Sequence, residues 1–261
     1  MKLNYRHGII FSIIGIFAGL LLFYLLSENF MIVVNGKNTT GRPDEALAVI
    51  ITYSMLGWFG ISASSMWAAV LYGFVKKENW AWYVGTMAAA LQMLAGFFPS
   101  IPAKSINLPA PTLTVFYIST VLWFAMLLIG KVNKKIIAFL FVSGLAYVLT
   151  YIDGVATISK YQTTTYNDFW KGMYIESQMV IWFGAAAWYI FAFAVLKRKK
   201  WALPLGIAAS FSSMIGGYPL AVVNIMEVHR FSMFLPAPVI ATGLLIYLLL
   251  PSTKKLIEEW E

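Results

Sequence analysis

The chain has 261 residues, of which 60% are hydrophobic and 11% are charged, and it carries a formal net charge of +8. A soluble domain has about 25% charged residues, so this composition excludes an ordinary soluble protein and indicates an integral membrane protein. Cysteine is absent, which excludes disulfides, thiolate chemistry and cysteine-ligated iron–sulfur or zinc sites. The basic residues lie in short clusters between apolar segments, where they set membrane orientation and do not indicate nucleic-acid binding.

Eight apolar segments follow one another along the chain, each near the ~20 residues that a membrane span needs. They cover residues 8–26 (with an extension to residue 34 left open), 47–75, 80–98, 109–130 (or 111–130), 136–158, 173–196, 201–217 and 234–250. A polar loop is expected at residues 35–45, and a charged tail at residues 254–261. The sequence therefore predicts an all-α, polytopic integral membrane protein with eight transmembrane helices.

The second half of the chain repeats short motifs of the first half in the same order. The matching motifs are Trp58-Phe59-Gly60 with Trp182-Phe183-Gly184, Lys76–Ala81 with Lys197–Ala202, and Leu108–Pro111 with Leu235–Pro238, at offsets of 124, 121 and 127 residues. We expect two tandem four-helix repeats, residues 1–130 and 131–261. Because four is an even number of spans, the repeats have to be parallel, related by an axis along the membrane normal.

Basic residues are unevenly divided between the two ends of the predicted spans. The termini and the even-numbered connections contain 13 of the 19 Lys and Arg residues, and the odd-numbered connections contain 6. The positive-inside rule then predicts a multi-pass protein of the cell (plasma) membrane with both termini in the cytoplasm. On the predicted outer side, Asn38-Thr39-Thr40 is an N-glycosylation sequon, which makes Asn38 a candidate glycosylation site.

Carboxylates near the predicted outer face are the first candidates for ligand binding. At an offset of 125 residues Glu28 aligns with Asp153, and such a pair would suit proton or cation binding near the repeat axis. The alternative is that both side chains end a helix at the interface and face water. Glu176 lies on the same face. Glu227 and Arg230 belong to a segment without a counterpart in the first half, where the alternative is a solvated local ion pair.

Gln92 and Gln178 are the most polar uncharged side chains inside the predicted spans. They either line a ligand pocket or hydrogen-bond across helices, and the second is the common arrangement in membranes. The two histidines, His7 and His229, exclude a bis-histidine haem at membrane depth and a histidine metal triad, so no metal or cofactor is expected. A redox role would require a diffusing carrier such as quinone, or a partner subunit.

Three functions remain open. The favoured one is an integral membrane subunit of a larger complex, respiratory or in contact with quinone or lipid, which packs against other subunits in the bilayer and has no catalytic activity of its own. The second is a transporter or channel for a small or apolar solute, and the third is an intramembrane enzyme that acts on lipid. The doubled four-helix plan resembles, in outline only, the quinone-reactive membrane anchor subunits of molybdenum oxidoreductases, and no motif of that family maps onto this sequence.

Overall fold

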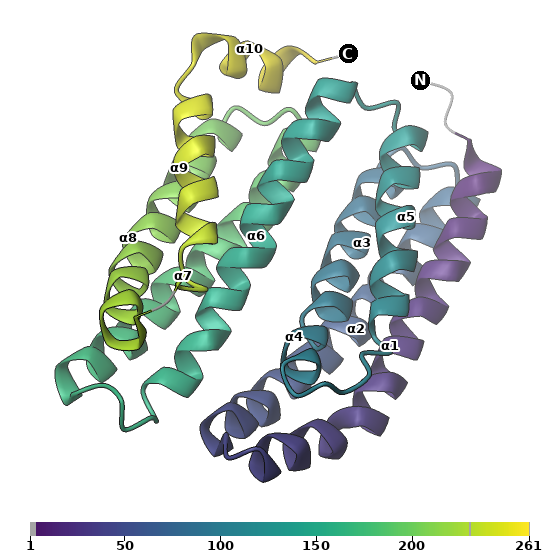
Figure 1. Ribbon diagram of the computed structural model, residues 1–261. Coiled ribbons are helices and arrows are strands. Elements are labelled where there is room, and N and C mark those ends of the chain that lie inside the picture. The colour runs from purple at the N-terminus through teal and green to yellow at the C-terminus, as the bar shows by residue number, and fades with distance from the viewer. Residues whose placement is uncertain (1–3, 230, 261) are drawn as a thin grey trace. The chain divides into compact units, whose positions relative to one another are not determined.

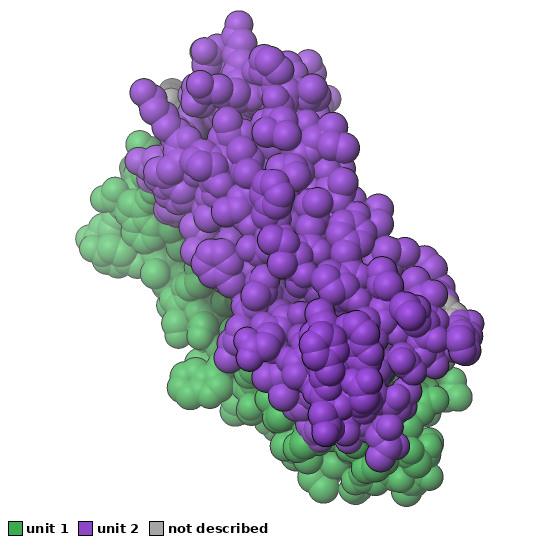
Figure 2. All heavy atoms as spheres, turned by 90° about the vertical axis from the view of Figure 1, so that its left-hand side faces the viewer, with its two compact units in different colours: residues 1–132 green, residues 133–261 purple. Residues whose placement is uncertain are grey.

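The structure is a computed structural model that describes residues 4–229 and 231–260 (Figure 1). The described residues are 83% helix and include no strand. The chain separates into two compact units, Met1–Val132 and Asn133–Glu261, which Figure 2 colours separately.

Unit 1 is a four-helix bundle with one additional short helix. Its helices are α1 (Tyr5–Thr39), α2 (Pro43–Val75), α3 (Ala81–Phe97), α4 (Ser100–Lys104) and α5 (Leu113–Ile129). α1 packs on α2, α2 on α3 and α3 on α5, and α5 returns to α1 and closes the ring. The centre of this ring contains Leu22, Leu56, Trp67, Leu94 and Val115, none of which has exposed surface.

Unit 2 is a second ring of four helices followed by a short helix. Its helices are α6 (Lys134–Lys160), α7 (Asp168–Leu196), α8 (Ala202–Val228), α9 (Pro236–Leu248) and α10 (Pro251–Glu259). α6 packs on α7, α7 on α8, α8 on α9, and α9 on α6.

The charged tail expected from residue 254 is instead the helix α10, which is bent by 86° from α9 and turns across its end (Figure 1). Ile257 is buried, and Trp260 Nε1 donates to the carbonyl oxygen of Val195 at 3.1 Å. The Arg198 guanidinium lies 4.4 Å from the centre of the Trp260 ring. The composition of this segment is that of a solvated tail. Its apolar face nevertheless packs α10 against the end of the bundle.

Among the described residues, six helical segments are long and apolar enough to cross a membrane: α1, α2, α3 with α4, α6, α7 and α8. α9 and α10 pass the same test only as a bent pair, and α5, with 17 residues, is shorter. Large apolar side chains point outward from several helices, with Phe17, Trp58 and Phe183 exposed by 66%, 72% and 61%. These lengths and surfaces are those of a membrane-embedded helical protein.

The prediction of a loop at residues 35–45 is wrong, because α1 continues to Thr39 and α2 begins at Pro43. Proline suits the first turn of a helix, and Asp44 and Glu45 in the same turn complement the helix dipole. The connection is reduced to residues 40–42, where Gly41 takes a φ of +72° that glycine adopts without strain.

The seventh apolar segment does not end at Gly217, since α8 continues through Pro219 to Val228. Leu220 of the added turns is buried in a cluster with Tyr174 of α7. Asn224 donates to the Tyr166 hydroxyl at 2.9 Å. These contacts compensate for the hydrogen bond that a proline removes from a helix, so tertiary packing overrides the local signal to stop.

Close approach of α3 and α5 depends on a glycine. A Cβ atom on Gly96 would lie 2.8 Å from the backbone nitrogen of Phe116 and 3.2 Å from the carbonyl oxygen of Thr112. Both are backbone atoms, which cannot rotate away as the end of a side chain can. Gly96 is therefore a small residue at a helix interface of the kind that membrane bundles use.

We expect Gly96→Ala to lower the free energy of unfolding by about 1–3 kcal/mol, the usual cost of overpacking. Gly144→Ala is the matched control, because a Cβ there meets nothing within 4 Å. Alanine is the better helix former, so the control should be neutral or slightly stabilised. Thermal unfolding of the purified proteins in one detergent measures both effects. A Gly96→Ala protein as stable as the wild type would contradict the close approach.

Candidate functional site

Asp153 is a buried acidic residue of the apolar helix α6, and its carboxyl group has no hydrogen-bond partner among the described residues. Its side chain on α6 is 2% exposed, and Oδ2 contacts no donor among the described residues. The helix is enclosed on every side at this level, since all residues from Thr150 to Val155 are buried. Asp153 belongs to the candidate span Lys134–Lys160, and an ionisable group inside a span is expensive and is by default a candidate for function. Asp153 is therefore the centre of the candidate site.

Polar groups of α6 and α7 meet at the next residue, Gly154. Gln178 Nε2 on α7 donates to the Gly154 carbonyl oxygen at 3.1 Å, and Thr157 Oγ1 donates to the same oxygen at 2.7 Å. The Trp182 indole packs against Gly154, where a Cβ atom would lie 2.3 Å from the indole Cδ1. Within the described chain, the buried Nε1 of Trp182 has no acceptor.

The α6–α7 contact thus holds a carboxyl acceptor and an indole donor that no described residue satisfies. The rings of Tyr151 and Trp182 stack at 6.5 Å with an interplanar angle of 22°, which fixes the orientation of the indole. In the described parts of the chain, no three His, Asp or Glu side chains gather into a group that could hold a metal ion. The chemical groups available at this contact are a titratable carboxyl group and an indole N–H donor.

The other carboxylates predicted from the sequence lie in different surroundings. Glu28 on α1, Glu176 on α7 and Glu227 in the last turn of α8 are all exposed. The structure therefore does not give Glu28 the environment of Asp153, although the two align in sequence. Arg230 lies outside the described residues, and Asn38 is exposed in the last turn of α1.

The side chain of Gln92 is fully buried and joins three helices of unit 1. Its Nε2 donates to the Gly15 carbonyl oxygen of α1 at 2.8 Å, and its Oε1 accepts from Trp67 Nε1 of α2 at 2.9 Å. Ser64 of α2 donates to the carbonyl oxygen of Ile16 at 3.0 Å beside it. Gln92, like Gln178, thus hydrogen-bonds across helices.

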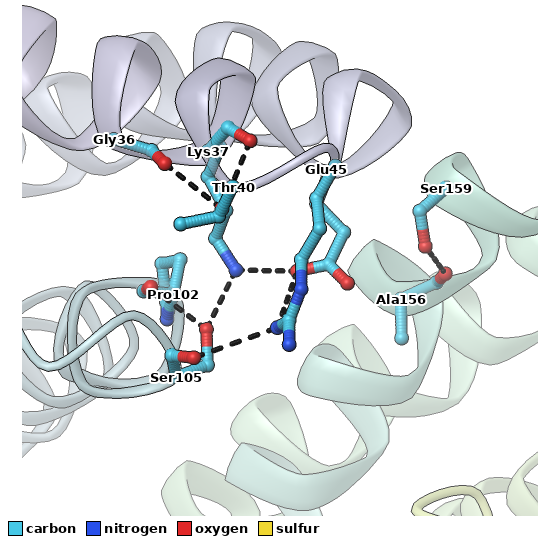
Figure 3. Close-up of polar contacts among 9 residues, drawn as sticks. Gly36, Lys37, Thr40, Glu45, Pro102, Ser105, Ala156 and Ser159 are labelled. Carbon is cyan, nitrogen blue, oxygen red and sulfur yellow. Dashed lines mark hydrogen bonds and ion pairs between the residues drawn. The ribbon is translucent and has the colours of Figure 1, made fainter.

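A buried lysine that the sequence did not single out lies at the end of unit 1 (Figure 3). Lys37 of α1 is 1% exposed, and its Nζ contacts the Glu45 carboxylate of α2 and donates to Ser105 Oγ at 2.6 Å. Arg42 Nη1 lies 3.9 Å from the same carboxylate and 3.5 Å from the Ser105 carbonyl oxygen. Because Ser105 directly follows α4, this network joins α1, α2 and α4. Its long-range partner is 68 residues from Lys37, which no local pattern signals.

Comparison with known proteins finds no family model, no curated protein and no solved structure that matches the chain.

We expect Glu45→Gln to destabilise unit 1 more than Lys37→Met does, although Lys37 is the more buried partner. Loss of the Glu45 charge leaves a buried ammonium group uncompensated, which costs about 3–5 kcal/mol. Loss of the Lys37 charge leaves a carboxylate that is 42% exposed and that water can hydrate. Unfolding in detergent, followed by tryptophan fluorescence, measures the difference.

Arg42→Gln is the control for this comparison, because Arg42 is 46% exposed and its contact with Glu45 is long. Such surface pairs contribute about 0–1 kcal/mol, so this variant should unfold close to the wild type. A Lys37→Met protein that is less stable than Glu45→Gln would show that the pair is not stabilised by charge compensation.

Proposed function

We propose that the protein has eight transmembrane helices in two tandem, parallel four-helix repeats, with both termini in the cytoplasm. We further propose that it is a subunit of a larger complex of the cell membrane. In this role it packs against other chains, contacts lipid or quinone, and performs no catalysis of its own.

Equivalent hydrogen bonds in the two units support the tandem repeat. Trp67 Nε1 of α2 donates to Gln92 of α3 at 2.9 Å, and Trp188 Nε1 of α7 donates to Ser213 of α8 at 3.1 Å. In each bond the partners are 25 residues apart. Position 188 lies 121 residues after position 67, which is also the offset of the lysine-rich motifs that follow these helices.

Backbone geometry supports the same register. Lys77 and Arg198, again 121 residues apart, have positive φ angles of 60° and 51°. Asn107 and His229, which precede the fourth helix of each ring, have φ angles of 59° and 53°. Positive φ is uncommon for residues other than glycine, so two such pairs at matching places favour a duplicated chain path.

The pairing of Trp58 with Trp182 is not supported by this register. An offset of 121 residues places Met179 opposite Trp58. Trp58 is 72% exposed, whereas Trp182 packs against Gly154. The equivalent tryptophans are therefore Trp67 and Trp188.

α5 and α9 occupy the same place in the two rings, and this favours a membrane crossing by both. At 1.5 Å per residue the 17 residues of α5 extend roughly 26 Å, close to the ~30 Å of the hydrocarbon core. α9, with 13 residues, needs the chain on either side to complete the crossing. The excess of basic residues at the termini and even-numbered connections supports the cytoplasmic orientation of that end.

The observation that carries the proposed role is the contrast between filled bundle centres and apolar outer faces. In unit 2, Ser213 accepts from Trp188 and lies 3.0 Å from the Thr150 hydroxyl, so the polar groups at the centre bond to one another as they do around Gln92. The outer faces carry large apolar side chains that include aromatic rings exposed by 59–72%: Tyr24, Trp58, Phe169, Phe183 and Phe231. Aromatic residues are enriched where proteins associate, so such faces suit packing against other membrane subunits.

We expect the full chain, extracted in a mild detergent, to co-purify with other membrane proteins in fixed stoichiometry. Native mass spectrometry measures this directly and also detects bound quinone or lipid. Trp58→Ala and Phe183→Ala should weaken retention of a partner without affecting folding, because both side chains lie on the surface. A lone, partner-free monomer in mild detergent would contradict the subunit role.

A second candidate function is proton- or cation-linked transport of a small solute, and the buried carboxyl group of Asp153 favours it. Transport requires that water or solute reaches Asp153 in some state of the protein. The third alternative, a lipid-acting enzyme, requires at least two carboxylates converging on one substrate atom. Since Glu28, Glu176 and Glu227 are exposed and Asp153 is buried, no observation favours it.

The natural absence of cysteine permits a direct test of the transport alternative. In sealed vesicles, Asp153→Cys should react with a small hydrophilic thiol reagent if the site is reached by water. Glu28→Cys is the exposed control, and Val115→Cys, in the core of unit 1, is the buried control. Labelling of Glu28→Cys with an Asp153→Cys as inert as Val115→Cys would rule out a water-accessible path.

A further inference from the structure

A groove of about 540 Å³ runs along the outside of unit 2 between α6 and α9. Its walls include Val142 of α6 and Tyr247 of α9, which are 40% and 38% exposed. Ala138 and Gly243 form the floor of the groove, and both are small and exposed. A Cβ atom on Gly243 would meet nothing within 4 Å, so the space above it is open.

A single charged side chain, Lys135, lines this groove. It lies in the first turn of α6 and is exposed, next to the exposed Lys134. Cations are unfavourable at a helix N-terminus, and no acidic residue occupies this first turn to offset them. A negative charge from outside the chain would therefore complement this end of the groove.

The corresponding groove of unit 1, between α1 and α5, has a similar volume of about 550 Å³ but differs in charge. Its lining residues, among them Ile13, Phe17, Tyr24 and Ile118, include no charged side chain. The positive end is thus specific to unit 2. An apolar ligand fits both grooves. A ligand with an anionic end fits the α6–α9 groove better than the α1–α5 groove, because only the former is lined by a lysine.

We propose that the α6–α9 groove binds one anionic phospholipid. The acyl chain lies along Ala138, Val142 and Gly243, and the phosphate group contacts the Lys135 ammonium. Basic pockets between transmembrane helices at the cytoplasmic end bind acidic lipid head groups, and Lys135 lies at the end that the proposed orientation places there. The inference rests on the proposed membrane orientation for the leaflet alone; it does not depend on the subunit role.

The test is native mass spectrometry of the full chain in detergent, titrated with phosphatidylglycerol or with phosphatidylcholine of the same chain length. The wild type should retain one phosphatidylglycerol in preference to phosphatidylcholine. Lys135→Gln should weaken phosphatidylglycerol binding about fivefold, the contribution of one lysine near a lipid phosphate, and remove the preference. Gly243→Leu should abolish binding because the leucine side chain fills the groove.

Each variant has a matched control at a position that does not line the groove. Lys134→Gln removes an adjacent exposed charge that does not line the groove, and Gly144→Leu adds a side chain to open space on α6 outside it. Both should bind phosphatidylglycerol like the wild type. Circular dichroism establishes folding, and Ala138→Leu replaces Gly243→Leu if the latter does not fold.

Equal binding of the two lipids by the wild type would overturn the proposal. Equal weakening of phosphatidylglycerol binding by Lys134→Gln and Lys135→Gln would also overturn it. The lysines would then attract the lipid by charge alone, whether or not they line the groove. Loss of a co-purifying protein chain from Gly243→Leu, with phosphatidylglycerol binding retained, would assign the groove to a partner helix instead.

Discussion

The structure depends on one constraint, that polar groups inside a lipid-facing bundle have to find partners within the bundle. Trp67 and Gln92 show how unit 1 meets it, because the indole N–H and both ends of the amide are bonded. The bonds connect three of the four helices through a side chain that has no exposed surface. With the polar groups used internally, the outer faces are free to be apolar and aromatic.

The second unit satisfies the equivalent indole with different residues, although it leaves Asp153 and Trp182 without partners among the described residues. Ser213 stands where Gln92 stands in the proposed register, and its short side chain cannot reach the backbone of the next helix. The Thr150 hydroxyl of α6 lies 3.0 Å from the Ser213 hydroxyl. The indole N–H thus bonds to one long side chain in unit 1, and in unit 2 to the first of two short hydroxyl side chains.

Apolar segments were predictable from the sequence because hydropathy is a local property, and every predicted segment contains a helix. Ends marked by local signals were also predictable, such as those of α2 at Val75 and α7 at Leu196, but three others were not, because distant contacts decide them. α1 reaches Thr39 alongside a lysine bonded to Ser105, α8 continues past Pro219 into a cluster around Tyr174, and α10 is held by Trp260. The site was predictable in part: the sequence identified Asp153 as a candidate, but only tertiary packing distinguishes it from the exposed Glu28.

The polar site around Gly154 belongs to unit 2 alone. In the proposed register, Gln178 and Trp182 correspond to Gly57 and Ile61, which carry neither an amide nor an indole. A Cβ atom on Gly57 would lie 3.5 Å from the ring of Phe23, so the neighbour at this position of unit 1 is apolar. In the proposed register the two units therefore differ at this level, because only unit 2 places a buried carboxyl group there without a hydrogen-bond partner among the described residues. A buried carboxyl group is costly in lipid, so packing alone gives no stabilising reason for Asp153, and the residue is a candidate for function by default.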